Sequence, residues 1–320
     1  MSVKVVIDCA SAGVRSGDKA RIRESTRMLF VGYGLAKLGY DVHLTGVPGG
    51  LPTWKVRWNI LTSCCRVADK CNSTDILITV GETESRIKRK LGVGFKTSVS
   101  CKNDHVMVGR YDIAMMHEYN MAFDKHQALF PIPFMVHEDV IRVLEEHDLL
   151  EAFLNDDLEP IRKHYAAEKR EPLLSYCGAN WHSRQAFFEG HPEWAEVIFY
   201  ETTRHRLTQE EHLHWLPSCL SQAVLCGDSP KCNLYNLCAM LGVPIVYEKI
   251  QQRIVPNVSD DNAIVVDGKP DWDDLKVKLS DDVLLAKIAA NATRDYKAGW
   301  SPLGMAKQLD KKFRDMGVVK

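Results

Sequence analysis

Two series of alternating strand and helix patterns, separated by a polar segment, constrain this chain more than any other feature. The first series starts with the apolar run at residues 3–9, VKVVIDC. Strand patterns follow at residues 41–45, 74–80, 96–101 and 111–116, and helical patterns lie between them at residues 20–38, 54–67 and 82–91. Strands that alternate with helices of this length indicate a parallel sheet with right-handed crossovers.

The second series begins after residues 131–171, a segment with a proline-bearing FPIPF stretch followed by helical and charged residues. Its strand patterns lie at residues 173–177, 196–200, 223–226, 244–247 and 263–266, again with helical patterns between them. A chain of 320 residues is long enough for two such domains. We expect Rossmann-like α/β domains over residues 1–130 and 172–300, a connection over 131–171, and a final helix over 301–320.

Composition excludes several classes of protein. No apolar run approaches the ~20 residues that cross a membrane, and the N-terminal apolar stretch is too short for a signal peptide. Ten cysteines are scattered along the chain, which indicates reduced thiols in a cytoplasm rather than a disulfide framework. Cys64, Cys65 and Cys71 lack the paired spacing of a zinc site, so we expect no metal. The expected form is a cytoplasmic monomer with no membrane partner.

The near-neutral total charge conceals an asymmetry. Residues 1–110 carry 18 Lys and Arg against 9 Asp and Glu, whereas residues 111–320 carry 23 against 33. A basic half attracts polyanions, although scattered solvated cations are the plainer explanation. The cations that we assign to such a partner lie in the loop after the first strand (Arg15, Lys19, Arg21 and Arg23) and in the predicted helix 82–91 (Arg86, Lys88, Arg89 and Lys90).

The glycine pattern Gly32-Tyr-Gly34 is similar to a dinucleotide-binding fingerprint, but its context is wrong. That fingerprint follows a strand and opens a helix. Here the glycines lie within a predicted helix that Gly39 ends. The pattern therefore does not predict an NAD site.

Two loops in the second half have the placement and chemistry of phosphate-binding loops. In LLSYCGANWHSR, a buried strand leads through Gly178 and Asn180 to Ser183 and Arg184 at a predicted helix start. Glycine lets a backbone approach a ligand, Ser183 is a candidate helix cap, and arginine binds phosphate oxygens through two parallel N–H groups. Plain helix capping is the alternative. The second loop, after the strand at 223–226, contains Gly227, Asp228, Ser229 and Asn233.

The strand–GDSP–helix–LGVPIVY order over residues 223–247 resembles the donor-binding segment of GT-B glycosyltransferases. In that family two Rossmann-like domains face each other across a cleft, and the last helix crosses back to the first domain. Within it, residues 178–184 and 225–267 most resemble the T-even-type phage DNA base (hydroxymethylcytosine) glucosyltransferases. The resemblance implies a UDP-sugar as co-substrate with no obligatory cofactor, and it adds Asn236 and Arg253 to the donor site. Asn236 departs from the glutamate that the family commonly carries there.

The resemblance also implies a catalytic carboxylate after the fourth strand of the first domain, where Asp104 lies; His117 and Glu118 are the alternatives. A carboxylate suffices to take a proton from a hydroxyl acceptor. The favoured acceptor is a hydroxymethylated base in double-stranded DNA. A small-molecule, lipid or protein acceptor is the alternative, and so is a non-catalytic module that binds nucleotide sugars or nucleic acid.

Overall fold

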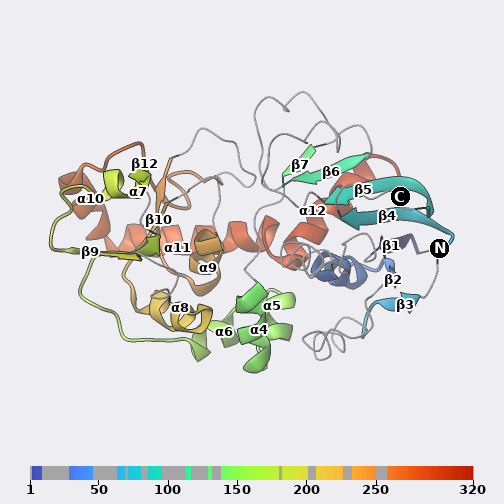
Figure 1. Cartoon of the computed structure of the whole chain (residues 1–320), viewed down its shortest axis with the longest axis horizontal. Coiled ribbons are helices and arrows are strands. Elements are labelled where there is room, and N and C mark those ends of the chain that lie inside the picture. The colour runs from blue at the N-terminus through green and yellow to red at the C-terminus, as the bar shows by residue number, and fades with distance from the viewer. Residues whose placement is uncertain are drawn as a thin grey trace. The chain divides into compact units, whose positions relative to one another are not determined.

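The computed structural model describes twelve stretches of the chain, and every structural statement below concerns these residues alone. They are residues 2–8, 29–45, 63–68, 71–80, 86–95, 112–116, 129–131, 138–179, 182–200, 207–225, 233–249 and 258–319. The chain divides into two compact units, each with its own parallel sheet (Figure 1). The first comprises residues 1–138, 154–156 and 298–320, and the second comprises residues 139–153 and 157–297.

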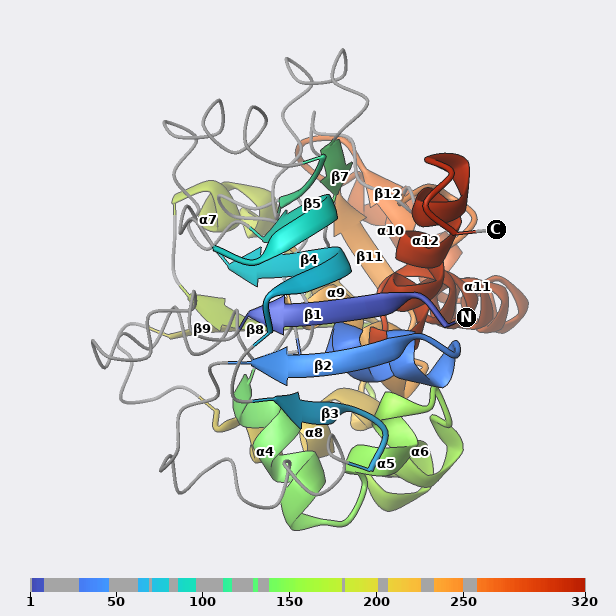
Figure 2. The same ribbon diagram turned by 90° about the vertical axis from the view of Figure 1, so that its right-hand side faces the viewer.

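The first unit is built on a seven-stranded parallel sheet in the order β3-β2-β1-β4-β5-β6-β7. Figure 2 shows β3, β2, β1, β4 and β5 side by side in this order. The apolar run at the start of the chain forms its middle, because Val5, Val6 and Ile7 are fully buried between β2 and β4. The strands are β1 (Lys4–Asp8), β2 (Asp41–Thr45), β3 (Arg66–Ala68), β4 (Ser73–Val80), β5 (Lys88–Phe95), β6 (Ile113–Met116) and β7 (Leu129–Pro131).

Two helices predicted from local pattern are wrong in the parts that the structure describes in this unit. The last four residues of the predicted basic helix 82–91 belong to a strand. Residues 88–95 form β5, which pairs with β4 from Ser73↔Lys88 to Val80↔Phe95. Tertiary pairing overrides the local pattern here, because Leu91 and Val93 are buried in the sheet. The end of the predicted helix 54–67 is also wrong, since Arg66–Ala68 form β3. The strand predicted at 96–101 lies outside the described residues.

The second unit has a five-stranded parallel sheet in the order β12-β11-β10-β8-β9. All five strands match sequence-predicted ones: β8 (Leu174–Ala179), β9 (Ala195–Tyr200), β10 (Gln222–Val224), β11 (Ile245–Glu248) and β12 (Ile264–Val266). The helices that lie wholly or mostly in this unit are α4 (Glu138–Glu146), α5 (Leu150–Leu154), α6 (Glu159–His164), α7 (His182–Phe188), α8 (Gln209–Trp215), the 3-10 helix η7 (Leu216–Ser218), α9 (Asn233–Leu241), α10 (Trp272–Leu279) and α11 (Asp282–Gly299).

The last helix, α12 (Pro302–Asp315), belongs to the first unit, as expected. It packs against the helix over residues 29–37, where a Cβ added to Gly34 would lie 2.6 Å from the Cβ of Ala306 and 2.9 Å from the carbonyl oxygen of Pro302. The hydroxyl of Tyr40 also donates to a carboxylate oxygen of Asp310 at 2.6 Å. Close helix packing is therefore the physical reason for Gly34 in the motif that is similar to a dinucleotide fingerprint.

Gly39 ends the helix over residues 29–37 in the way that its sequence position predicts. Its φ is +92°, which favours glycine. Gly39 N–H donates to the carbonyl of Ala36, and Tyr40 N–H donates to that of Leu35, the two hydrogen bonds of a Schellman cap. No helix among the described residues is long and apolar enough to cross a membrane.

Candidate functional site

The strand order of the second sheet indicates a candidate ligand site. The chain enters at β8, places β9 on one side of it, and then places β10, β11 and β12 on the other. The topological switch point thus lies between β8 and β10. Because open parallel sheets bind ligands at the carboxyl ends of the strands beside this point, the segments after β8 and β10 are the candidate site. These are the two loops that the sequence analysis selected.

Gly178 lies near the carboxyl end of β8, and the structure adds a packing reason for it. A Cβ at this position would collide with the phenol of Tyr176, lying 2.8 Å from its Cζ atom. The Tyr176 ring packs against Phe188 of α7 and Phe199 of β9, with ring centroids 4.8 and 5.7 Å away. Glycine therefore makes room for the aromatic core under α7, in addition to leaving the backbone open at the end of the strand.

Helix α7 carries two of the predicted donor residues. It begins at His182, so Ser183 lies inside its first turn rather than before it. Arg184 follows at the next position with a half-buried side chain. An arginine in the first turn after β8 lies at the switch point and can offer two N–H groups to a phosphate. Asn180, between β8 and α7, is outside the described residues.

Helix α9 brings its N-terminus to the other side of the switch point. It starts at Asn233, directly after the predicted loop that contains Gly227, Asp228 and Ser229, which lie outside the described residues. A helix N-terminus presents N–H groups and the positive end of its dipole, which favours an anion. Asn236, one turn further along α9, is fully buried, so its side chain is enclosed by the protein.

The opposite end of α9 is held by a cation that the sequence analysis did not select. The Nε atom of Arg162 donates to the carbonyl of Met240 at 2.9 Å. One of its terminal nitrogens donates to the carbonyl of Ala239 at 3.2 Å and to the Thr293 hydroxyl at 2.7 Å. Burial lowers the pKa of the Arg162 guanidinium. Arg162 caps the negative end of the helix whose positive end lies at the switch point, and no local sequence signal pairs these segments.

Two further carboxylates lie at carboxyl ends of strands and were missed. Asp8 ends β1, which stands at the switch point of the first sheet because β2 lies on one side of it and β4 on the other. Glu248 ends β11 in the second sheet. Both side chains are half-buried. The sequence feature that could have identified both is a charged residue at the end of an otherwise apolar strand.

The cations that we predicted in a helix over residues 82–91 lie at the amino-terminal edge of the first sheet. Lys88, Arg89 and Lys90 begin β5, and Lys90 forms an ion pair with Asp75 at 2.7 Å. Together with Lys4 they line a pocket of about 370 Å³ at the amino ends of β1, β4 and β5. A strand of eight residues spans about 23 Å, so these cations lie far from the carboxyl edge of the sheet. Arg86 precedes them and is exposed.

Several predicted residues lie outside the described residues, and nothing is assigned to them structurally. They are the candidate catalytic residues Asp104, His117 and Glu118, the loop cations Arg15, Lys19, Arg21 and Arg23, and Arg253. In the described part of the chain, no group of three or more His, Cys, Asp or Glu side chains is arranged to hold a metal ion.

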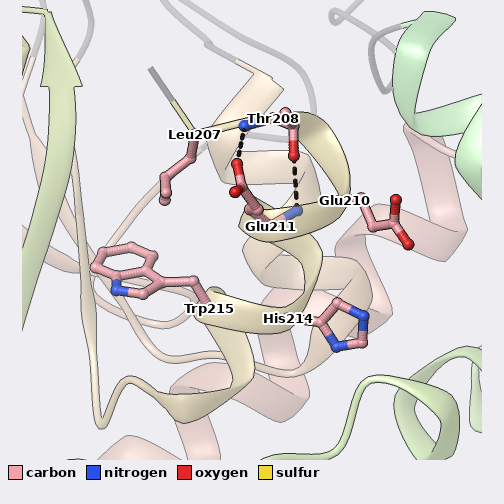
Figure 3. Close-up of a pocket in the computed structure, with 6 residues that line it drawn as sticks. All are labelled: Leu207, Thr208, Glu210, Glu211, His214 and Trp215. Atoms are coloured by element: carbon pink, nitrogen blue, oxygen red, sulfur yellow. Dashed lines mark hydrogen bonds between the residues drawn. The ribbon is translucent and has the colours of Figure 1, made fainter. Parts of the chain in front are cut away.

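A separate pocket of about 600 Å³ lies along α8 in the second unit. Figure 3 shows Leu207 and Trp215 on one side of it and Glu210 and His214 on the other. Thr208 and Glu211 form a capping box at the start of α8 (Figure 3), which satisfies two helix-end donors. The lining comes from α8 and its cap, with no residue of the segments after β8 and β10, so this pocket is distinct from the switch-point site.

No protein-family model and no curated protein matches this sequence. Crystal structures that share its fold include the following two. AviGT4, a glycosyltransferase involved in avilamycin A biosynthesis, is 15% identical over 98% of both chains, with a TM-score of 0.50. Alr3699/HepE from Anabaena, in complex with UDP and glucose, is 10% identical over 98% of this chain and 99% of its own, with a TM-score of 0.52. This likeness confirms the expected architecture: the chain has the GT-B fold, with two Rossmann-like α/β domains and a C-terminal helix that returns to the first.

Proposed function

We propose that this chain is a glycosyltransferase that transfers a sugar from a nucleoside-diphosphate sugar. The expected donor is a UDP-sugar. The observation that carries the proposal is the switch point between β8 and β10, because the adjoining segments contain Gly178, Arg184 and the start of α9. The fold adds support, since one structure of this fold binds UDP and glucose.

The chemistry follows from charge. When the glycosidic bond breaks, the departing diphosphate gains negative charge, which fixed cations and helix N-termini stabilise in the transition state. Arg184 supplies the cation, and the N-terminus of α9 supplies the dipole. Asn180, Ser183, Gly227, Asp228, Ser229, Asn233, Asn236 and Arg253 complete the proposed donor site.

Titration calorimetry with UDP-glucose and related nucleotide sugars tests the donor site. Arg184→Ala should weaken binding by about 1.5–3 kcal/mol, the usual value of a charged hydrogen bond. Arg142→Ala is the matched control, because Arg142 is exposed on α4 and pairs with Glu146 in an i,i+4 ion pair. Equal affinity of wild type and Arg184→Ala for every donor would remove Arg184 from the site. Slow release of sugar to water by the wild type distinguishes an enzyme from a binding module.

For the acceptor we propose a hydroxymethylated base in double-stranded DNA. Support comes from the excess of cations in residues 1–110. The cations of the loop after β1 follow the carboxyl end of a switch-point strand, and we assign them the contacts nearest the reacting base. Arg86 and residues 88–90 would contact phosphates further along the duplex, since they lie at the amino edge. Reaching a base hydroxyl requires flipping the base, at a cost of a few kcal/mol.

Asp104 is the proposed base that takes the acceptor proton, with His117 and Glu118 as alternatives. Asp104→Asn should abolish transfer while leaving donor and DNA affinity unchanged. Asp8→Asn is the informative companion variant because Asp8 lies at the switch point of the first sheet. If Asp8→Asn abolishes transfer and Asp104→Asn does not, the assignment of Asp104 is wrong.

The acceptor is tested by mass spectrometry of nucleosides from hydroxymethylated DNA incubated with the protein and donor. A hexosylated nucleoside is the expected product. DNA affinity should fall steeply with salt through counterion release, and charge reversal at residues 86–90 should reduce it without changing donor affinity. Negligible DNA affinity at low salt would leave a small-molecule, lipid or protein acceptor.

A further inference from the structure

Two adjacent cysteines lie at the start of the edge strand of the first sheet. Cys64 and Cys65 directly precede β3, and their Sγ atoms are 3.9 Å apart. Cys64 is partly exposed, whereas only 3% of Cys65 is exposed. The pair therefore presents one accessible thiol with a second thiol beneath it at hydrogen-bonding distance.

Cys64 opens into a pocket. The pocket has a volume of about 570 Å³, and Cys64 lines it together with Ser2, Tyr40, Asp41, Val42 and Arg66. The Asp41 carboxylate, the one acidic group of this lining, is engaged by His43 at 3.0 Å and by Arg66 at 3.5 Å. Its negative charge is thereby partly balanced, and the pocket has room for a small molecule beside the Cys64 sulfur.

The surroundings favour the thiolate form of Cys64. The hydrogen bond with Cys65 lowers the pKa of the Cys64 thiol to about 7, and the positive charge of Lys37 and a hydrogen bond with Ser63 act in the same direction. Partial burial opposes these effects. Reactive cysteines are partly exposed and lie in electropositive surroundings of this kind, whereas buried structural ones are inert.

We propose that Cys64 is a modification site that reacts with small disulfides of the glutathione class, and that the Cys65 thiol stabilises the Cys64 thiolate by donating a hydrogen bond to it. In this exchange the Cys64 sulfur attacks one sulfur of the disulfide. A new sulfur–sulfur bond forms, the original one breaks, and the departing thiolate takes a proton from water. The disulfide is the oxidant, so the step needs no other reactant. The proposal does not depend on glycosyl transfer.

The test follows modification of the intact protein by oxidised glutathione, with tryptic peptides resolved by mass spectrometry. Cys64 and Cys65 fall on one peptide, residues 58–66. The Cys65→Ser variant therefore locates the adduct, and it keeps a hydrogen-bond donor beside Cys64. Cys71 is the internal reference, since it is also partly exposed and its thiol donates to the carbonyl of Ser73 at 3.3 Å.

At pH 6 we expect Cys64 to react about sixfold faster than a thiol of pKa ~8.5. The thiolate fraction of Cys64 is about thirtyfold higher at this pH, but the thiolate of the more acidic thiol is about fivefold less nucleophilic. Cys65→Ala should slow Cys64 about threefold to sixfold relative to Cys65→Ser, and Cys71→Ser should leave its rate unchanged.

Three results would overturn the proposal. They are modification of Cys71 as fast as Cys64 at pH 6, identical rates for Cys65→Ala and Cys65→Ser, or a wild-type pH–rate midpoint near 8.5 instead of about 7. The last measurement uses the wild type alone, so it decides the question even where Cys65→Ala fails to fold.

Discussion

Replacing Arg162 by methionine tests whether helix α9 is held at its C-terminal end. Methionine keeps much of the length of the side chain but removes the guanidinium and its three hydrogen bonds. The carbonyl of Ala239 still has a donor within reach, because the Thr293 hydroxyl lies 2.8 Å from it and equally close to the carbonyl of Ala289. The main loss therefore falls on the carbonyl of Met240 and on the interaction of the cation with the C-terminus of α9.

The magnitude follows from these two losses. A hydrogen bond from a charged donor contributes about 1.5–3 kcal/mol, and a cation at a helix C-terminus contributes about 0.3–1 kcal/mol more. The variant recovers part of this because the buried guanidinium no longer has to be desolvated, a cost visible in the lowered pKa of Arg162. We expect Arg162→Met to lower the free energy of unfolding by about 2–3 kcal/mol, and Arg162→Lys, which keeps the charge, by about half as much.

Urea unfolding followed by tryptophan fluorescence measures the stability, and calorimetry measures donor affinity. We expect donor affinity to fall about tenfold, equivalent to 1.4 kcal/mol, since the N-terminus of α9 shifts when its other end is released. Arg142→Met on the exposed face of α4 is the control and should change stability by less than about 0.5 kcal/mol. If Arg162→Met is as stable as this control and binds donor like the wild type, Arg162 does not hold α9.

Three further predictions concern other contacts. Gly34→Ala should destabilise the first unit, because overpacking against α12 costs about 1–3 kcal/mol and the better helix propensity of alanine offsets only ~1 kcal/mol of this. Gly34→Val should cost more, and a Gly34→Val variant with the melting temperature of the wild type would contradict this prediction. Tyr40→Phe should lower the unfolding free energy by about 1.5 kcal/mol, because the hydrogen bond to the Asp310 carboxylate is lost, and thermal denaturation will measure it. Burial, His147 and His214 together lower the pKa of His164, so the folded chain binds a proton less readily than the unfolded chain. Stability should therefore fall as the pH drops below about 6.5, and His164→Gln should lose less than the wild type in urea titrations at pH 7.5 and 5.5.

The sequence by itself determined the fold class and the position of the candidate site. Buried parallel strands appear as continuous apolar runs, and a glycine just beyond a helix marks its end, so β1, β8, β10 and the cap at Gly39 are all encoded locally. Because every strand of a parallel sheet ends at the same edge, the polar segments after β8 and β10 also followed from pattern alone. The fold comparison confirms the architecture that this pattern predicts.

Other features depended on residues far apart in the chain, and only the tertiary structure decided them. The segment at residues 88–95 is a strand because β4 pairs with it along its length, which outweighs a local pattern that indicated a helix. Gly34 is required by α12, some 270 residues later. Arg162 reaches α9 across 78 positions of sequence. Periodicity records which face of an element is buried but not which element covers it, so contacts of this kind become visible only when the chain is folded.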